Sequence, residues 1–392
     1  MGFLDFIKSF LGKILKKSEI KNKNEAEIPV ASDNSLKKAI SPPLPIKSEQ
    51  ELASKLGKIL KKSEIKNKNE VEIPVAFDNS LKKAISPPLP IKSEQELASK
   101  LGITQKQLEL YVNFQRKNYY TFYIPKKNGD KRRIDAPKKR LKQIQRWILE
   151  NILSNVEFLP CVNGFVKKRS IKTNADQHVN KEIVLKLDLY NFFPSIGIDR
   201  VIKVFRDMGY SKRVSKYLAK LVTYKNKLPQ GAPTSPALSN IVCKKLDTRL
   251  FTLVKKLNEL HNFECSYTRY ADDITFSGNL KFRKSLYCFI PLVKKIINDE
   301  GFKINKRKIT FMRKGSKQTV TGLVVNKKVN IPREKYRIMR SIIHNLSKIS
   351  DPTKKKELQK YIEGYLAFTK SINLQKYQKL KDLYNSKTKY GY

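Results

Sequence analysis

Apolar residues recur at spacings of three and four along much of the chain, and this pattern predicts amphipathic helices. In residues 1–17, one helical face carries phenylalanine, isoleucine and leucine, and the lysines lie away from it. The same spacing predicts further helices over 138–153, 198–222, 236–256, 289–297 and from Arg333 onward. The chain is therefore expected to contain several amphipathic helices.

Short runs rich in β-branched and aromatic residues predict strands between these helices. Residues 119–135 predict two strands joined at an Asn-Gly pair, which is typical of a tight hairpin turn. Residues 183–187 form an apolar run with one lysine, as in a buried strand. Residues 265–278 predict a second hairpin with an acidic pair at its turn, and further strands are expected within 303–311.

Three carboxylates lie at the ends of these strands. Asp188 follows the buried run, and Asp272 and Asp273 form the acidic pair of the hairpin. Adjacent like charges repel, so a fold keeps them together only beside a cation, and hard Mg²⁺ prefers carboxylate oxygens. If the two strands are neighbours in one sheet, the three side chains can hold the two metal ions of phosphoryl transfer. An isolated Asp-Asp pair is, by contrast, usually a solvated turn.

Three motifs give these carboxylates a family context. Residues 270–273 resemble the Tyr-x-Asp-Asp signature of reverse transcriptases. Residues 188–195 resemble the first catalytic motif of that family, and residues 228–236 resemble its template- and nucleotide-gripping motif. The resemblance implies RNA-directed DNA synthesis from deoxynucleoside triphosphates. It also implies that the three carboxylates are catalytic and bind two Mg²⁺ ions, helped by the backbone carbonyl of Leu189.

The same resemblance implies a nucleotide-binding set. An aromatic ring at Phe193 would exclude a 2′-hydroxyl, and Gln230 and Gly231 would lie against the base pair being formed, where a small residue allows close approach. The basic hairpin is placed like the fingers segment that closes on a triphosphate, and guanidinium groups hold phosphate bidentately. For its basic residues, a solvated turn is the alternative. The expected nucleotide-binding residues are Lys127, Arg132, Arg133, Phe193, Gln230 and Gly231.

Two further elements, at 174–178 and 320–322, resemble the Asn-Ala-x-x-His and Val-Thr-Gly markers of retron reverse transcriptases. They imply contact with a cognate structured non-coding RNA, although His178 would otherwise be an ordinary core histidine. The resemblance further implies a branched single-stranded DNA product, anti-phage defence and an effector protein encoded nearby. Nothing acidic after Gly322 resembles an RNase H centre, so a host RNase H is the expected partner for template removal. The expected RNA-binding residues are Asn174, His178, Val320, Thr321 and Gly322.

The expected fold is therefore α+β, a right-hand polymerase with fingers, palm and thumb, and with an antiparallel palm sheet backed by helices. We expect the fingers at 93–180, the palm at 181–325 and the thumb at 326–392. Residues 96–104 resemble the start of a helix-turn-helix. We favour a helical lead-in to the fingers there, and a DNA-binding element is the alternative.

A duplicated extension precedes this region. Residues 11–55 recur as residues 56–100, a period of 56 − 11 = 45, with only two positions changed. Such close identity indicates a recent tandem duplication and not a solenoid. Its lysine-, asparagine- and proline-rich composition is linker-like, so 18–92 is expected to be partly disordered. The amphipathic helix at 1–17 is expected to dock on a membrane or a partner protein, or to pack on the chain's own body.

Charge and cysteine usage narrow the partners and the compartment. The chain has 82 lysines and arginines against 35 acidic residues, a net charge of +47. This excess indicates a polyanionic partner, with nucleic acid first and an acidic membrane second. The tendency of a low-GC genome to encode lysine and asparagine is an alternative explanation for part of the excess. Four scattered cysteines imply no zinc site and favour a reducing cytoplasm. No apolar run reaches transmembrane length, and no signal-peptide cleavage site is present.

Two alternatives to a retron enzyme stay open. The chain could be another bacterial reverse transcriptase, of intron-encoded or diversity-generating type, or a non-catalytic scaffold that binds RNA with a polymerase fold. The absence of a maturase or endonuclease extension after the thumb argues against the intron type. The intact carboxylates argue against the scaffold.

Overall fold

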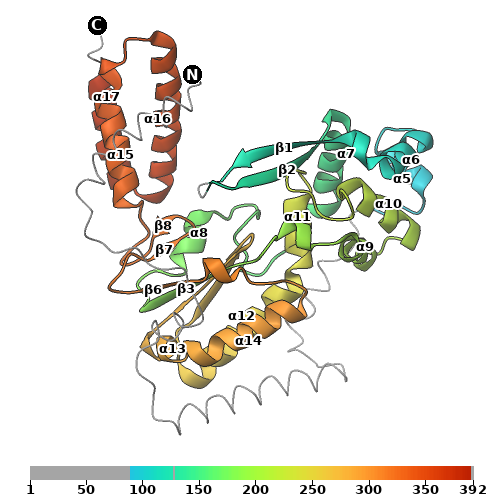
Figure 1. Ribbon diagram of the computed structural model, residues 1–392, viewed down its shortest axis with the longest axis horizontal. Coiled ribbons are helices and arrows are strands. Elements are labelled where there is room, and N and C mark those ends of the chain that lie inside the picture. The colour runs from blue at the N-terminus through green and yellow to red at the C-terminus, as the bar shows by residue number, and fades with distance from the viewer. Residues whose placement is uncertain (1–88, 127–128, 390–392) are drawn as a thin grey trace.

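The computed structural model describes residues 89–126 and 129–389. The helix expected at 1–17 and nearly all of the duplicated extension lie outside the described residues. Within them, helices surround three antiparallel sheets, so the expected α+β class is confirmed. A central sheet backed by helices carries two further units, which lie on opposite sides above it (Figure 1). This is the expected right-hand arrangement of palm, fingers and thumb.

The palm sheet contains four antiparallel strands in the order β4-β5-β3-β6. The strands are β3 (Ile183–Asp188), β4 (Ser266–Tyr270), β5 (Asp273–Gly278) and β6 (Thr310–Arg313). Strand β3 is the buried strand expected from its apolar run, and β4 with β5 is the expected acidic hairpin. The strands expected within 303–311 are only partly present, because a 3₁₀ turn at Lys306–Lys308 precedes β6.

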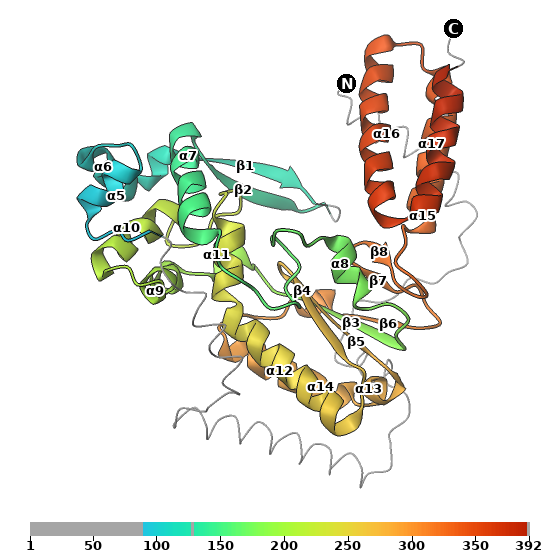
Figure 2. The same cartoon turned by 180° about the vertical axis from the view of Figure 1, so that it is seen from behind.

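Helices back one face of this sheet, and a smaller layer covers the other (Figures 1 and 2). The backing helices are α12 (Lys244–His261), α13 (Leu280–Lys284) and α14 (Leu286–Asp299), with α11 (Ser235–Val242) leading into α12. The helix expected over 236–256 is therefore two helices that meet at Cys243. The other layer contains α8 (Ile171–Asp176), β7 (Thr319–Val320) and β8 (Leu323–Val324).

The two faces bury different clusters because side chains alternate along a strand. Leu185 of β3 and Phe276 of β5 belong to the main core, which the backing helices complete. Val184 points the opposite way and packs with Val320 beneath the smaller layer. Asp188 lies four residues after Val184 and therefore shares this second face. The catalytic candidates thus lie on the side of the sheet away from the backing helices.

The fingers unit combines segments from both sides of β3. Its first part contains α5 (Glu94–Lys100), α6 (Gln105–Asn113), a 3₁₀ turn (Gln115–Asn118), β1 (Tyr119–Pro125), β2 (Lys131–Pro137), α7 (Lys139–Ile148) and a π-helical turn (Leu149–Leu153). Its second part contains α9 (Ile198–Asp207) and α10 (Lys212–Val222). Helix α10 packs against α5, α6 and α7, whereas α8 packs on the palm strands. Relative to the expected boundary at residue 180, α8 precedes it but packs on the palm, and α10 follows it but packs on the fingers.

Side-chain caps fix the helical lead-in to the fingers. The Ser93 hydroxyl accepts a hydrogen bond from the Glu96 amide, and Thr104 forms a reciprocal capping box with Gln107. Gly102 has a φ of +62° at the turn between the two helices. These helices pack on α10, which agrees with the expected lead-in.

The thumb is a bundle of three helices with its own core. The helices are α15 (Arg333–His344), α16 (Pro352–Ile372) and α17 (Leu374–Lys389), with a 3₁₀ turn at Leu346–Lys348. Met339, Ile343, Ile362 and Leu380 lie in a cluster separate from the palm core. The helices expected from Arg333 onward are confirmed. Among the residues that the structure describes, no helix has both the length and the apolar character needed to cross a membrane.

Candidate active site

The structure brings the three expected carboxylates to one edge of the palm sheet. Asp188 ends β3 and lies directly opposite Asp273, the first residue of β5. Asp272 lies in the two-residue turn between β4 and β5, after Ala271. The Leu189 amide donates a hydrogen bond to the Asp272 carbonyl, with 3.0 Å between N and O. The expectation that these strands are neighbours in one sheet is therefore confirmed.

Burial and mutual repulsion make this cluster unfavourable when it is fully ionised. The pKa of Asp272 is raised to about 6, first by burial and then by the charges of Asp273 and Asp188. Burial also raises the pKa of Asp273, while Lys186 acts in the opposite direction. A bound cation would relieve this repulsion, and carboxylate oxygens are the donors that hard divalent ions prefer.

A lysine supplies the positive charge at Asp188. Lys308 Nζ lies 2.7 Å from Asp188 Oδ2, and Asn305 Nδ2 donates to Oδ1 at 3.4 Å. Within residues 89–126 and 129–389, no three His, Cys, Asp or Glu side chains are already arranged as a metal site. The donor chemistry nevertheless fits a divalent cation. The side chain of Lys308, which pairs with this carboxylate, is 59 % exposed.

An aromatic pocket adjoins the catalytic turn. Phe193, which begins a 3₁₀ turn (Phe193–Ser195), and Gly231 both line this pocket of about 300 Å³. The Phe165 ring links it to the signature hairpin, with centroid distances of 6.2 Å to Phe193 and 6.4 Å to Tyr270. Half-buried Phe193 is thus accessible from the pocket, and its role as a steric gate stays a prediction. The other lining residues are Lys142, Arg146, Phe165, Ala232, Pro233, Ser235 and Pro236.

Gly231 packs against the fingers hairpin. Its φ is +141°, and a Cβ there would lie 2.9 Å from the Asp135 carbonyl oxygen and 2.9 Å from Ile134 Cγ2. The Asp135 amide donates to the Gln230 carbonyl at 3.0 Å. The backbone is closely approached at this glycine, but the neighbour is β2 and not a base pair. Contact of Gln230 and Gly231 with a base pair stays a prediction.

The two arginines of the fingers hairpin lie on opposite faces. Arg133 Nη2 forms an ion pair with Asp135 at 2.9 Å, on one face of β2. Arg132 lies on the other face, together with Ile134, because successive residues of a strand alternate. That second face meets the glycine described above. Triphosphate binding by Arg132 and Arg133 stays a prediction, and Lys127 lies outside the described residues.

The histidine of the first retron marker is a core residue. His178 is fully buried, with Nδ1 2.7 Å from Ser277 Oγ and Nε2 2.7 Å from Thr268 Oγ1. Burial lowers its pKa to about 3, so the ring is neutral. Asn174 is also buried. The expectation that these two side chains contact RNA is therefore wrong, because both are buried. His178 instead connects the segment after α8 to β4 and β5 through the hydroxyls of Thr268 and Ser277.

The second retron marker forms the turn between β7 and β8. Val320 is fully buried, which contradicts RNA contact by its side chain. Thr321 and Gly322 make the turn with φ values of +46° and +82°. The Thr321 hydroxyl donates to the Ile171 carbonyl at 3.0 Å, and Gly322 is exposed. RNA contact through these two turn residues stays a prediction.

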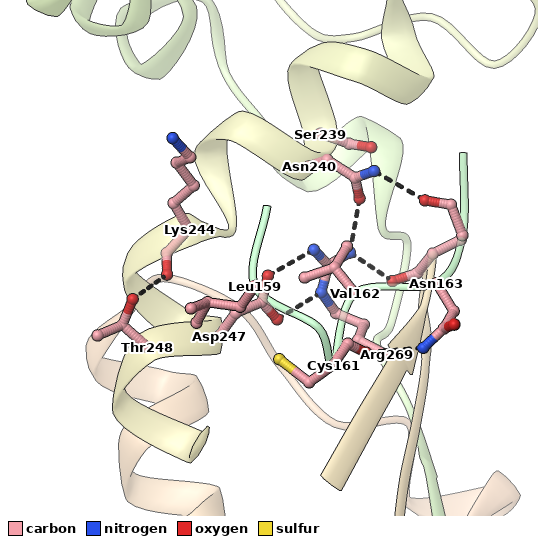
Figure 3. Close-up of polar contacts among 12 residues, drawn as sticks. Leu159, Cys161, Val162, Asn163, Ser239, Asn240, Lys244, Asp247, Thr248 and Arg269 are labelled. Atoms are coloured by element: carbon pink, nitrogen blue, oxygen red, sulfur yellow. Dashed lines mark hydrogen bonds and ion pairs between the residues drawn. The ribbon is translucent and has the colours of Figure 1, made fainter. Parts of the chain in front are cut away.

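Sequence reasoning missed a buried network beside the catalytic turn (Figure 3). Arg269 of β4 donates from Nε and Nη2 to the two carboxylate oxygens of Asp247 on α12, at 2.7 and 2.6 Å. Its Nη1 donates to Asn240 Oδ1 at 3.0 Å and to the Ala271 carbonyl at 3.1 Å. The Tyr267 hydroxyl also donates to Asp247, at 2.7 Å. The sequence signal that could have revealed this network is Arg269 itself, a charged residue at a core-facing position of the strand before the acidic pair.

Comparisons with known proteins place this site in a family. The family model "Reverse transcriptase (RNA-dependent DNA polymerase)" matches residues 124–325, which include β2 of the fingers hairpin, the whole acidic hairpin and all three carboxylates. Enzymes of this family use divalent metal ions. A telomerase structure from Candida albicans, in complex with a fragment of telomeric RNA, matches 74 % of this chain and 62 % of its own. Its TM-score is 0.40 with 12 % identity, too low to carry an argument.

Retron reverse transcriptases are more similar to this chain in sequence than the telomerase is. The retron Ec86 reverse transcriptase of Escherichia coli is 37 % identical, over 67 % of this chain and 79 % of its own. The retron Ec73 enzyme, also from E. coli, is 35 % identical over 68 % and 87 %. The retron Mx65 enzyme of Myxococcus xanthus is 36 % identical over 67 % of this chain, which spans 64 % of that longer protein. The chain therefore belongs to the reverse transcriptases of retron type, a family of RNA-directed DNA polymerases.

Proposed function

We propose that this chain synthesises DNA on an RNA template from deoxynucleoside triphosphates, with Asp188, Asp272 and Asp273 as its catalytic residues. The observation that carries the proposal is the cross-strand pair of Asp188 and Asp273, with Asp272 in the adjoining turn. The donor set supports two Mg²⁺ ions, with the Leu189 carbonyl as a further ligand. When bound, these ions lower the pKa of an attacking 3′-hydroxyl and neutralise the triphosphate and the leaving pyrophosphate.

The surrounding residues would position the substrates. Phe193 and Phe165 form an aromatic wall of the pocket, which supports exclusion of a 2′-hydroxyl. Arg132, on the hairpin face that meets the pocket, would hold phosphate oxygens. Arg133 is already engaged by a carboxylate on the opposite face. Lys308 would hold Asp188 in the metal-free protein and move away when cations bind.

The retron relationship supports a finer proposal. We infer a cognate structured non-coding RNA as template, a branched single-stranded DNA as product, and a role in anti-phage defence with an effector protein. Host RNase H would remove the template. A net charge of +47 supports a nucleic-acid partner. The four cysteines, all within the described residues, form no disulfide there, which supports the reducing cytoplasm as the compartment.

The experiment that tests this proposal recovers nucleic acid from cells carrying the native locus. The sample is treated with RNase and run on a denaturing gel, with and without a 2′,5′-debranching enzyme. We expect a discrete DNA that debranching shifts and that Asp272→Asn abolishes. Asp207→Asn, at an exposed position on α9, is the matched control and should leave the product unchanged.

The possible outcomes separate the parts of the proposal. Product that persists in Asp272→Asn would contradict the assigned site. Absence of product, together with primer extension by the purified chain, would retain the polymerase and remove the retron-specific part. Absence of both activities would favour a non-catalytic RNA-binding scaffold.

A further inference from the structure

The turn that carries Asp272 contains a strained residue. Ala271 has a φ of +58°, a region that residues with a Cβ rarely adopt. In two-residue hairpin turns, this position is usually glycine, asparagine or aspartate. Alanine has no polar side chain that could hold this conformation locally. The turn therefore depends on contacts from beyond its own two residues.

Arg269 provides one of these contacts. Its side chain is 0 % exposed and that of Asp247 is 1 % exposed. Because two of its nitrogens bind both oxygens of Asp247, the plane of the guanidinium group is fixed by α12. The third nitrogen, Nη1, donates to the Ala271 carbonyl at 3.1 Å. The planar guanidinium group thus connects the backbone immediately before Asp272 to the palm helix α12.

A second set of contacts near the turn involves Asn240 and Asn163, both of which lie beside Arg269 (Figure 3). Asn240 accepts from Arg269 Nη1 through its Oδ1 and donates from Nδ2 to the Gly164 carbonyl at 2.8 Å. A Cβ at Gly164 would lie only 2.5 Å from the Ala271 amide nitrogen. The Asn163 amide also donates to the Arg269 carbonyl at 2.8 Å. Arg269, Asn240 and Gly164 are thus linked by hydrogen bonds, and both Arg269 and Gly164 contact the backbone of Ala271.

We propose that Arg269 is a positioning residue for metal binding, because its contact with Ala271 sets where Asp272 and Asp273 present their carboxylates. The inference rests on the proposed function, since it takes these aspartates as metal ligands. Stability alone explains the network poorly, because apolar packing often replaces a buried ion pair without loss. Side chains that orient metal ligands, in contrast, commonly change metal affinity when they are substituted.

The test measures Mn²⁺ binding to the intact chain without nucleic acid, from the electron paramagnetic resonance signal of the free ion. Arg269→Lys keeps a cation beside Asp247 but cannot also reach Ala271 in the same plane. We expect its Mn²⁺ affinity to fall about tenfold. The metal concentration for half-maximal primer extension should rise in parallel. Tyr267→Phe is the matched control, because it removes a hydrogen bond to Asp247 and leaves the turn contact intact.

The outcomes distinguish positioning from structural support. Equal Mn²⁺ affinity in wild type and folded Arg269→Lys, or an equal loss in Tyr267→Phe, would overturn the inference. If Arg269→Lys does not fold, Arg269→Gln carries the test, because its amide cannot bind both Asp247 oxygens and Ala271, and unchanged affinity in that folded variant overturns the inference as well. Asp272→Asn separates failure of the proposed metal site from failure of the inference about Arg269. If Asp272→Asn binds Mn²⁺ like the wild type, the proposed metal site is wrong and the inference fails with it. If Asp272→Asn abolishes binding while Arg269→Lys has no effect, the inference alone fails.

Discussion

The two hairpins of this enzyme have similar local structure and opposite surroundings. In the catalytic hairpin, every residue of β5 after Asp273 is buried, and β5 lies between two other strands of the sheet. In the fingers hairpin, every residue of β1 after Tyr119 is exposed, and β1 and β2 form a sheet of their own. The fingers hairpin is anchored at its base, where Gln145 donates to the Tyr119 hydroxyl at 2.7 Å.

This difference separates two tasks of a polymerase. Metal ligands must be held within fractions of an ångström, and the hairpin proposed to carry them is fixed by the sheet and by the buried ion pair of Arg269 with Asp247. A segment that closes on an incoming nucleotide must move, and exposed backbone with few packing contacts moves at low cost. We therefore expect substitutions in the catalytic hairpin to act on catalysis and those in the fingers hairpin to act on nucleotide affinity.

Among substitutions that keep the carboxylates, the largest expected effect follows from crowding the catalytic turn. In Gly164→Ala, the new Cβ would meet the Ala271 amide nitrogen at 2.5 Å, and a backbone neighbour moves only with the turn itself. A displacement of about 1 Å at a reacting centre costs on the order of 100-fold in rate. We expect kcat to fall by that order, while the KM for nucleotide changes little. A kcat equal to that of the wild type would show that the turn is not held at this point.

A smaller effect is expected in the fingers hairpin. Arg132→Ala removes the guanidinium group on the face that meets Gly231, and we expect the KM for nucleotide to rise about tenfold, the cost of one charge-assisted hydrogen bond. The matched variant Arg133→Ala should change KM less, because that side chain is paired with Asp135. Steady-state kinetics with varied nucleotide concentration would decide this. A larger effect of Arg133→Ala would reverse the assignment of the two faces.

Acid should weaken the palm through His178. Burial lowers the pKa of His178 from 6.5 to about 3, so below pH 6.5 the unfolded chain takes up a proton that the folded chain excludes. Its contribution to stability is complete above pH 6.5 and decreases as the pH falls toward 3, by about 1.4 kcal/mol at pH 5.5. Unfolding by urea at pH 7.5 and 5.5 would measure this decrease.

The acid test needs a background without the catalytic carboxylates. The raised pKa of Asp272 has the opposite effect, because its folded form binds a proton more readily and gains stability as the pH falls through about 6. Asp272→Asn combined with Asp273→Asn removes this opposing contribution. In that background, replacing His178 by glutamine should flatten the pH dependence. An unchanged pH dependence would contradict a neutral, buried histidine.

The smallest effect is expected far from both hairpins. Gly364 lies exposed inside α16, and a Cβ there meets no atom within 4 Å. Gly364→Ala should therefore stabilise the thumb helix by about 0.5–1 kcal/mol, since glycine is a weak helix former. Thermal unfolding would measure this gain, and activity should not change. Lost activity would show that this thumb surface has a role of its own.

Local pattern predicted the elements that carry the chemistry. The apolar run before Asp188 and the alternation around the acidic pair each define a strand. Their pairing followed from the need to bring the carboxylates together. The fingers hairpin and the thumb helices were predicted in the same way, from short-range spacing.

The errors concern features that tertiary packing decides. A histidine in a family motif is compatible with RNA contact or with a core position, and the hydroxyls of Thr268 and Ser277 decide for the core. The pair of Arg269 and Asp247 joins a strand to a helix 22 residues away, so no short-range pattern reveals it. The packing of α10 on α5 likewise depends on the whole fold, which is why the linear fingers boundary failed.

The most direct test of the central claim is primer extension by the purified chain, on an RNA template with a DNA primer, as Mg²⁺ is titrated. We predict synthesis by the wild type only with the divalent cation, and a loss on the order of 10²–10³-fold or more in Asp272→Asn. Asp207→Asn should match the wild type. Synthesis without divalent metal, or equal synthesis by Asp272→Asn and wild type, would contradict the assignment of the carboxylate cluster as the catalytic centre.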